Sequence, residues 1–146
     1  MATIGVISDT HGLLRPEALE ALKRSTHIIH AGDVGDPAIL ERLREIAPVT
    51  VVRGNVDYGA WAENVPEIDL LEIDGVTIYV RHILEKLDVK PEAAGIHAVV
   101  YGHSHTPKKE TKNGVLYFNP GSAGPKRFNL PVTVGKLIVE DKKIRG

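Results

Sequence analysis

The sequence predicts an α/β fold in which two β-sheets pack against each other and helices cover the outside. Three observations lead to this prediction. Residues 1–53 alternate strand-like and helix-like stretches, residues 70–139 read mainly as strands and hairpins, and no repeat, linker or low-complexity segment interrupts the chain. Because 146 residues can enclose one core without disulfides, we expect residues 1–146 to form a single domain.

The first part of the chain is typical of parallel strands joined by helices. Runs rich in Val, Ile and Thr, bounded by Gly, Asp or Pro, are predicted as strands at Thr3–Ser8, His27–Ala31 and Val49–Arg53. The segments Arg15–Lys23 and Asp36–Ile46 repeat apolar residues on one side and carry a proline at the start, as helices do. This β-α-β-α-β order implies parallel strands with right-handed crossovers.

The second part of the chain reads as antiparallel. Asp74-Gly75 is a two-residue hairpin signal, and Lys112-Asn113-Gly114 predicts a second hairpin. Strands are predicted at Leu70–Ile73, Val76–Arg81, His97–Tyr101, Val115–Asn119 and Val132–Val139. A parallel half followed by an antiparallel half favours two packed sheets rather than one.

Composition excludes several kinds of site and location. The chain has no cysteine, so a metal would have to be held by nitrogen and oxygen ligands. The N-terminus has neither a basic region nor a long apolar stretch, and no segment approaches the roughly 18 apolar residues that span a bilayer. We therefore expect a cytoplasmic protein that does not associate with membranes.

Charge is unevenly distributed although the formal net charge is only −1. Residues 1–106 hold 9 Lys and Arg against 16 Asp and Glu, whereas residues 107–146 hold 9 against 3. A basic C-terminal segment could attract phosphate-rich partners. We favour the simpler interpretation, in which lysines coat the solvated face of edge strands and discourage aggregation: Lys108, Lys109, Lys112, Lys142 and Lys143.

Polar side chains follow five of the predicted strands. They are Asp9, His11, Asp33, Asn55, His82, His103 and His105. In open α/β sheets, ligands bind beyond the carboxyl ends of the strands. Residues i and i+2 of an extended chain share a side, so Asp9 can align with His11, and His103 with His105. The preceding Gly32, Gly54 and Gly102 allow a tight bend and a close backbone approach.

Each of these residues also has a structural interpretation. Asp9, Asp33 and Asn55 could cap helices or turns, and His82 could be a core histidine. We assign His27, His30 and His97 to the core on that basis. His103 and His105 are harder to explain by packing, because two imidazoles on one face need hydrogen-bond partners or a cation.

The number of candidate ligands favours a dinuclear metal centre. Seven is too many for one tetrahedral zinc, which takes four, and suits two ions that share a bridge. A carboxylate has two oxygens, so we predict that Asp33 binds both ions. Two divalent ions carry a charge of +4, and the carboxylates of Asp9 and Asp33 contribute −2. The centre therefore keeps a net charge near +2, which attracts anions and lowers the pKa of bound water.

At this point the sequence resembles the calcineurin-like metallophosphoesterases, and more narrowly their small bacterial and archaeal phosphodiesterase branch. The residues that carry the resemblance lie between residue 4 and about Arg127: Asp9-Thr10-His11-Gly12, Gly32-Asp33, Gly54-Asn55-Val56-Asp57, His82, Gly102-His103-Ser104-His105-Thr106-Pro107 and Asn119-Pro120-Gly121-Ser122. The resemblance implies a four-layer α/β/β/α sandwich with two mixed sheets and a dinuclear site at one edge.

The resemblance also implies how the ligands divide. One metal would take Asp9, His11, Asp33 and His105, and the other Asp33, Asn55, His82 and His103. The metals of this family are commonly Mn, Fe, Zn, Ni or Co, and Mn is our first choice.

The chain departs from the family pattern at two positions. Many relatives carry a histidine after the Gly-Asn pair, where it protonates the leaving group, whereas this chain has Val56. Its loss should hurt most for poor leaving groups, which favours phosphodiesters. Relatives often follow the histidine equivalent to His82 with glycine, whereas Ile83 follows here, and the segment to His103 is short. We read the short segment as the absence of a lid.

The predicted function is a metal-dependent phosphodiesterase that uses a hydroxide bridging two ions as nucleophile. The predicted catalytic residues are His11, Asn55 and His103, with His11, His103 or a metal-bound water as the source of the leaving-group proton. The expected substrate is a small, nucleotide-like phosphoester. Tyr58 and Trp61 could stack a base but are expected to pack their loop, and Lys126 and Arg127 could reach a phosphate or only decorate a loop.

Two alternatives stay open on the sequence alone. The same fold resembles a retromer subunit that acts as a non-catalytic protein-interaction scaffold. A nuclease would use the basic C-terminal segment, but no arginine–aromatic pattern supports nucleic acid as the partner. A homo-oligomer is compatible with the sequence.

Overall fold

The computed structural model describes residues 1–126 and 130–146. The strands are β1 (Ala2–Ile7), β2 (His27–His30), β3 (Val49–Val51), β4 (Ile68–Ile73), β5 (Val76–Arg81), β6 (Ala98–Val100), β7 (Lys108–Lys112), β8 (Val115–Asn119), β9 (Gly135–Glu140) and β10 (Lys143–Arg145). The helices are α1 (Pro16–Leu22), α2 (Pro37–Arg44), α3 (Ala60–Glu63) and the 3-10 turn η1 (Leu84–Lys86).

The strands form two mixed sheets of five strands each. The first has the order β10-β9-β1-β2-β3, with β1, β2 and β3 parallel and β9 and β10 antiparallel to their neighbours. The second has the order β4-β5-β6-β8-β7, with the middle three strands parallel and an antiparallel strand at each edge. The predicted fold class is therefore confirmed as two packed mixed sheets.

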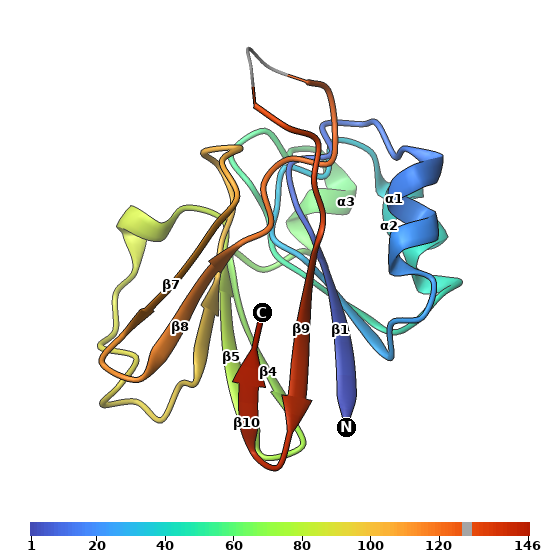
Figure 1. Cartoon of the computed structure of the whole chain (residues 1–146). Helices are drawn as coiled ribbons and strands as arrows, with labels where there is room; N and C mark the ends of the chain where they lie inside the picture. The colour runs from blue at the N-terminus through green and yellow to red at the C-terminus, as the bar shows by residue number, and fades with distance from the viewer. Residues whose placement is uncertain (127–129) are drawn as a thin grey trace.

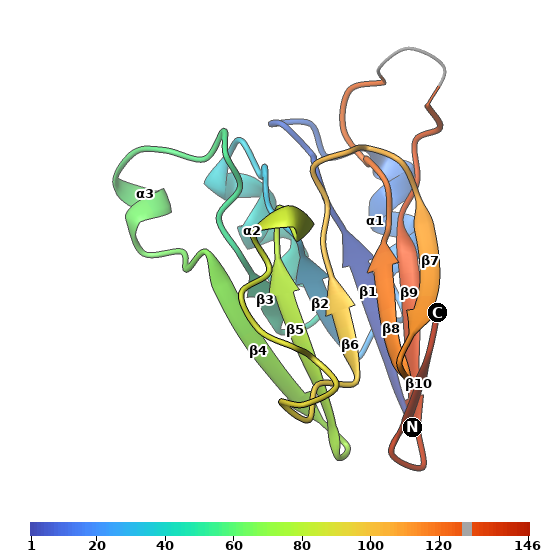
Figure 2. The same cartoon turned by 90° about the vertical axis from the view of Figure 1, so that its left-hand side faces the viewer.

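The sheets pack face to face through an apolar layer that both contribute. Ile4 and Ile29 of the first sheet and Ile78 and Val100 of the second are fully buried there. The outer face of the first sheet buries apolar residues of α1 and α2, among them Leu22. The outer face of the second sheet is covered by residues 84–96, whose regular structure in the described chain is η1. Figure 1 shows this unequal covering, with α1 and α2 on the side of the first sheet that faces away from the second sheet. Figure 2 shows α1 near β1 and α2 near β3.

The parallel strands of both sheets end on one side of the molecule. Figure 2 shows the arrowheads of β1, β5, β6 and β8 pointing to the same end, where the connecting loops gather. The predicted strands extend one or two residues beyond the observed ones at Ser8, Ala31 and Arg53, because the backbone bends there into these loops.

Three features of the second half differ from the sequence prediction. It is not antiparallel throughout, because β5, β6 and β8 run parallel and only the hairpin partners reverse direction. The last long strand begins at Gly135 rather than Val132, and it joins the first sheet beside β1. The strand β10 was not predicted, because its turn is Asp141-Lys142, which has positive φ without the glycine that usually signals it.

The lysine-rich strands lie at sheet edges, as predicted. β7 is the last strand of the second sheet and β10 the last of the first, and their lysines are exposed. No helix of the described residues has the length and apolar character that crossing a bilayer requires.

Candidate metal centre

The seven predicted ligands meet where the parallel strands of the two sheets end. Asp9 and His11 follow β1, Asp33 follows β2 and Asn55 follows β3, so the first sheet supplies four of them. His82 follows β5, and His103 and His105 follow β6, so the second sheet supplies three. Among the described residues, six of the seven fall into two compact groups: Asp9, His11 and His105, and Asp33, His82 and His103.

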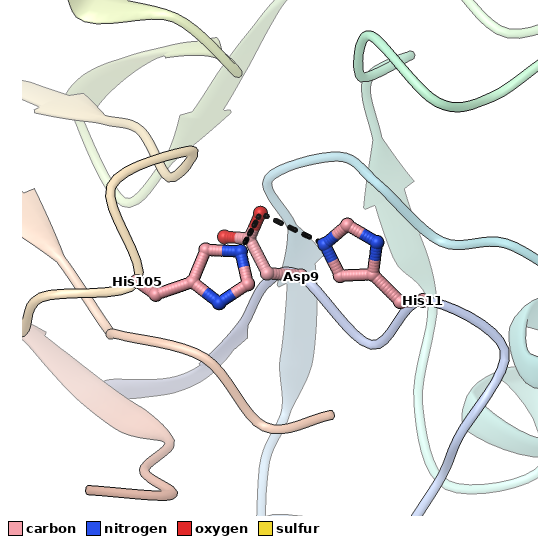
Figure 3. Close-up of side chains that lie close together, drawn as sticks. All are labelled: Asp9, His11 and His105. Atoms are coloured by element: carbon pink, nitrogen blue, oxygen red, sulfur yellow. Dashed lines mark ion pairs between the residues drawn. The ribbon is translucent and has the colours of Figure 1, made fainter. Parts of the chain in front are cut away.

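The first group surrounds the buried carboxylate of Asp9. His105 Nε2 lies 3.5 Å and His11 Nε2 lies 3.7 Å from Asp9 Oδ1. Figure 3 shows the two imidazoles approaching this oxygen from opposite sides, one from the loop after β6 and one from the loop after β1. Asp9 Oδ1 and His11 Nε2 are buried and make no hydrogen bond within the described chain, although both are strong polar atoms. A cation between them would compensate for this unmet burial.

The second group is centred on Asp33. His82 Nε2 lies 3.0 Å from Asp33 Oδ2, while His82 Nδ1 lies 2.8 Å from the carbonyl oxygen of Ala31. Because that carbonyl can only accept, Nδ1 of His82 carries a proton and Nε2 is directed at the centre, as in metal-binding histidines. The ring of His103 packs edge-on against His82 with centroids 5.3 Å apart.

The two groups lie within contact distance of each other. Asp33 Oδ2 lies 3.5 Å from His11 Nε2 of the first group as well as 3.0 Å from His82 of the second. Asp9 Oδ1 likewise lies 3.7 Å from His82 Nε2. Asp33 thus occupies the position between the groups that the bridge prediction requires. His103 and His105, although adjacent along the loop, fall into different groups.

Asn55 completes the second group. One end of its side-chain amide lies 3.1 Å from His82 Nε2, 3.1 Å from Asp33 Oδ2 and 3.2 Å from His103 Nδ1. Without an ion, the amide nitrogen at this end has Asp33 Oδ2 and His103 Nδ1 as its acceptors. With a cation among them, the amide oxygen would occupy the same place as a further ligand. This donor set of nitrogen and oxygen atoms fits a divalent metal.

The backbone is strained at the ligand positions. Among the described non-glycine residues, positive φ angles occur at five of the seven candidates: Asp9, His11, Asp33, His103 and His105. The left-handed region costs roughly 1 kcal/mol or more per residue for most side chains and clusters at functional sites. The other positive φ angles lie in the turns at Asp74, Asn113 and Asp141-Lys142, so the strain separates into hairpins and this centre.

All three of the predicted glycines allow the loops to approach closely. A Cβ on Gly32 would overlap the side chain of His82. A Cβ on Gly54 would overlap the carboxylate and the backbone nitrogen of Asp33, and a Cβ on Gly102 would overlap the hydroxyl of Ser8. Any side chain at either position would push apart two strands that carry ligands.

Asp57 joins the loops that carry Asp33 and Asn55. Its buried carboxylate accepts hydrogen bonds from the backbone N–H groups of Val34 at 3.2 Å, Gly35 at 2.9 Å and Gly54 at 3.0 Å. The backbone N–H of Val56 in turn donates to Asp33 Oδ1 at 3.0 Å. Asp57 therefore fixes the spacing of the two loops without facing the centre itself.

Sequence reasoning missed the part played by Ser8 and Asn119. Ser8 Oγ donates to Asp9 Oδ2 at 2.8 Å, and the backbone N–H of His103 donates to the same oxygen at 3.1 Å, which leaves Oδ1 directed at the centre. Asn119 Nδ2 donates to the carbonyl of Gly102 and to Ser104 Oγ, and so holds the loop between the two histidines. The sequence signal that could have identified these two residues is their position as polar residues at the end of a buried strand, Ser8 after β1 and Asn119 at the end of β8.

The carboxylates and His82 have shifted pKa values in the absence of an ion. Burial raises the pKa of Asp9, which outweighs the opposing effect of His82 and of the Ser8 hydroxyl. For Asp33, burial is outweighed by the His82 hydrogen bond and the Val56 N–H, which lower the pKa to about 2. For His82, burial is outweighed by the bond to Asp33 and the charge of Asp9, which raise the pKa. Both shifts in pKa favour the charged form, the carboxylate of Asp33 and the imidazolium of His82.

The predictions for residues outside the metal centre were confirmed for some residues and wrong for others. His30 is a core histidine as predicted, fully buried with Nε2 3.0 Å from Thr10 Oγ1, and His27 and His97 also make hydrogen bonds within the fold. Trp61 packs against the helical side of the first sheet as expected. The same expectation was wrong for Tyr58, which is 84% exposed. Lys126 is exposed, and Arg127 lies outside the described residues.

The family model for the calcineurin-like phosphoesterase superfamily domain matches residues 2–142. A probable metallophosphoesterase of Methanocaldococcus jannaschii is 38% identical over an alignment of 152 positions, which covers 95% of this chain and 77% of that protein.

Solved structures agree with this assignment. An archaeal phosphodiesterase of known structure superposes with a TM-score of 0.82 and 25% identity, covering 98% of this chain and 97% of the other. Vps29 from Chaetomium thermophilum has the same TM-score of 0.82 at 20% identity, covering 96% of this chain and 83% of the other, which is a likeness of fold. With two ligand groups at the strand ends and a family match over almost its whole length, this chain belongs to the calcineurin-like phosphoesterase superfamily.

Proposed function

We propose that this metallophosphoesterase is a phosphodiesterase that acts on a small, nucleotide-like substrate with two divalent ions, Mn first among them. The observation that carries the proposal is the position of Asp33 Oδ2, which lies 3.5 Å from His11 Nε2 and 3.0 Å from His82 Nε2. One carboxylate between two groups of nitrogen and oxygen ligands suits a pair of ions and not a single one.

The proposed ligand sets follow from the two groups. Asp9, His11 and His105 hold one ion together with Asp33, and His82, His103 and Asn55 hold the other, also with Asp33. Ions bound there would polarise the phosphate oxygens and lower the pKa of water, which supplies the nucleophile.

The residue beside Asn55 favours phosphodiesters, and in general esters whose leaving group is acidic. The residue after Asn55 is Val56, whose partly exposed side chain has no proton to give. Any proton for the leaving group must then come from His11 or His103, which are the least buried histidines of the two groups, or from water. Substrates with acidic leaving groups need this proton least, so they should be hydrolysed fastest.

The two other predicted functions have less support. The likeness to Vps29 is compatible with a protein-interaction scaffold, but a scaffold does not require seven ligands and strained backbone at five of them. The nuclease would need the basic C-terminal segment to face a nucleic acid. Its lysines on β7 are partly neutralised, since Lys108 and Lys112 both lie within ion-pair distance of Glu110.

The test combines metal analysis with a matched pair of variants. The wild-type protein, stripped and reloaded with Mn²⁺, should bind about two ions per chain and hydrolyse bis-p-nitrophenyl phosphate faster than p-nitrophenyl phosphate. Asp33→Asn should lose both ions and at least a hundredfold in kcat. Asp36→Asn, only three residues away, keeps its role as N-cap of α2 and should change neither. Two ions and full turnover in Asp33→Asn would show that Asp33 is not the bridge.

A further inference from the structure

A basic pocket adjoins the second ligand group. It opens onto Asn55 and His82, and its walls carry three cationic side chains, Arg53, Arg81 and Lys86. Arg53 stands two residues before Asn55, and Arg81 ends β5 directly before His82. The strand ends that present ligands to the centre therefore also bring positive charge to its flank.

The charge of this pocket is only partly neutralised. Among the residues that line it, Glu67 is the one carboxylate, and it accepts a hydrogen bond from Arg53 Nη2 at 3.0 Å. Arg81 Nη1 lies 3.7 Å from the exposed Asp88, outside the lining. Lys86 makes no ion pair within the described parts of the chain. Three cations against one lining carboxylate attract an anion.

Arg81 is held in position rather than free in solvent. Arg81 Nη1 donates to the hydroxyl of Tyr79 at 3.4 Å, and this hydroxyl donates to Asp88 at 3.1 Å. A guanidinium whose orientation is already fixed loses little conformational entropy when it binds an anion, and its fork of N–H donors matches phosphate oxygens. Lys86 adds a point charge from η1.

We propose that this pocket binds a second phosphate group of the substrate, so that the substrate is a nucleotide-like phosphodiester with a further phosphate beside the bond that is cleaved. The inference rests on the proposed function and deepens it. The competing explanation is that Arg53 and Arg81 only tie loops together through Glu67 and Asp88. In that case Lys86, which makes no such tie, has no effect on substrate choice.

The test compares two substrates that differ only in the second phosphate. Thymidine 5′-(p-nitrophenyl phosphate) and the same compound with a 3′-phosphate release the same leaving group, and both are assayed with the Mn²⁺-loaded protein. We expect the 3′-phosphate to raise kcat/KM by about tenfold, the effect of one charge-assisted contact. Lys86→Arg should keep this ratio, Lys86→Gln should bring it close to one, and Lys86→Glu should reduce it further.

The matched control is Lys90→Glu, an equally exposed lysine in the same segment that does not line the pocket. It should keep the tenfold ratio. A ratio near one in the wild-type protein, or an equal loss in Lys86→Glu and Lys90→Glu, would overturn the proposal, the latter by showing only a diffuse effect of net charge.

A binding measurement separates this proposal from the proposed function. Calorimetric titration with thymidine 3′,5′-bisphosphate and thymidine 5′-monophosphate needs no turnover. If neither ester is hydrolysed but the bisphosphate binds about tenfold more tightly and Lys86→Glu abolishes the difference, the pocket stands and the phosphodiesterase assignment fails. Equal affinities for the two nucleotides would reject the pocket whatever the catalytic result.

Discussion

Asp57 offers the sharpest test of how the centre is held together. Its carboxylate accepts three backbone hydrogen bonds, and two of the donors, Val34 N and Gly54 N, belong to buried residues. Asp57→Ala leaves those two N–H groups without a partner, at about 1–3 kcal/mol each, while water replaces the partner of the exposed Gly35. We therefore expect a loss of about 4 kcal/mol in the free energy of unfolding. For a chain of this length, this corresponds to a fall of roughly 8–16 °C in Tm.

A capping aspartate in the loop between β2 and α2 sets the scale for comparison. Asp36 accepts one hydrogen bond from the backbone N–H of Ala38 at an exposed helix start, so Asp36→Ala should cost only about 1 kcal/mol. The assay is urea unfolding of the metal-free proteins, with Asp57→Asn as a milder variant that keeps the shape of the side chain. The same variants should bind Mn²⁺ about 10–100-fold more weakly, because the loops of Asp33 and Asn55 lose their common anchor. If Asp57→Ala were no more destabilising than Asp36→Ala, and Mn²⁺ affinity were unchanged, the three hydrogen bonds of Asp57 would have no role in the centre.

Three further predictions follow from individual contacts. Asn119→Ala removes the hydrogen bonds to Gly102 and Ser104 and should cost about 1–3 kcal/mol and loosen Mn²⁺ binding; wild-type affinity in calorimetry would contradict this. Burial lowers the pKa of His30 to about 3, so the unfolded chain binds more protons below pH 6.5, and stability should fall by about 2 kcal/mol from pH 7 to pH 5 on this account. His30→Gln should show a smaller fall in urea unfolding over that range, and an unchanged fall would assign the acid sensitivity elsewhere. Val56→His supplies a proton donor beside Asn55 and should raise kcat at least tenfold for an alkyl phosphodiester but little for a p-nitrophenyl ester; equal gains for both would point to a cause other than proton donation.

The sequence predicted the centre better than the sheets around it. Asp9, Asp33 and His103 were recognisable because each follows a buried apolar run, and strand ends are where an α/β fold exposes polar groups. The strand β9 could not be assigned to its sheet, because the pairing of Gly5 with Lys136 joins residues far apart in the chain and leaves no local pattern.

The supporting contacts were the least predictable part of the centre. Ser8 binds one particular oxygen of Asp9, and Asp57 accepts hydrogen bonds from two loops at once. Both contacts depend on tertiary packing and have no fixed spacing in the sequence. The exposure of Tyr58 was missed for the same reason. An aromatic residue next to a turn usually finds a core to pack against, and only the path of residues 55–59 shows that this one does not.

Each ligand group draws side chains from both sheets, and this has a mechanical consequence. The first group joins Asp9 and His11 of one sheet to His105 of the other, and the second joins Asp33 to His82 and His103. Ions held there would act as cross-links between the layers at one end only, whereas the β4–β5 and β9–β10 turns lie at the opposite end of the apolar layer, away from the ligands. Metal loading should then slow amide hydrogen exchange most strongly beside the ligands and progressively less toward those hairpins. The two sheets of the metal-bound protein would then separate first at the end that carries the hairpins.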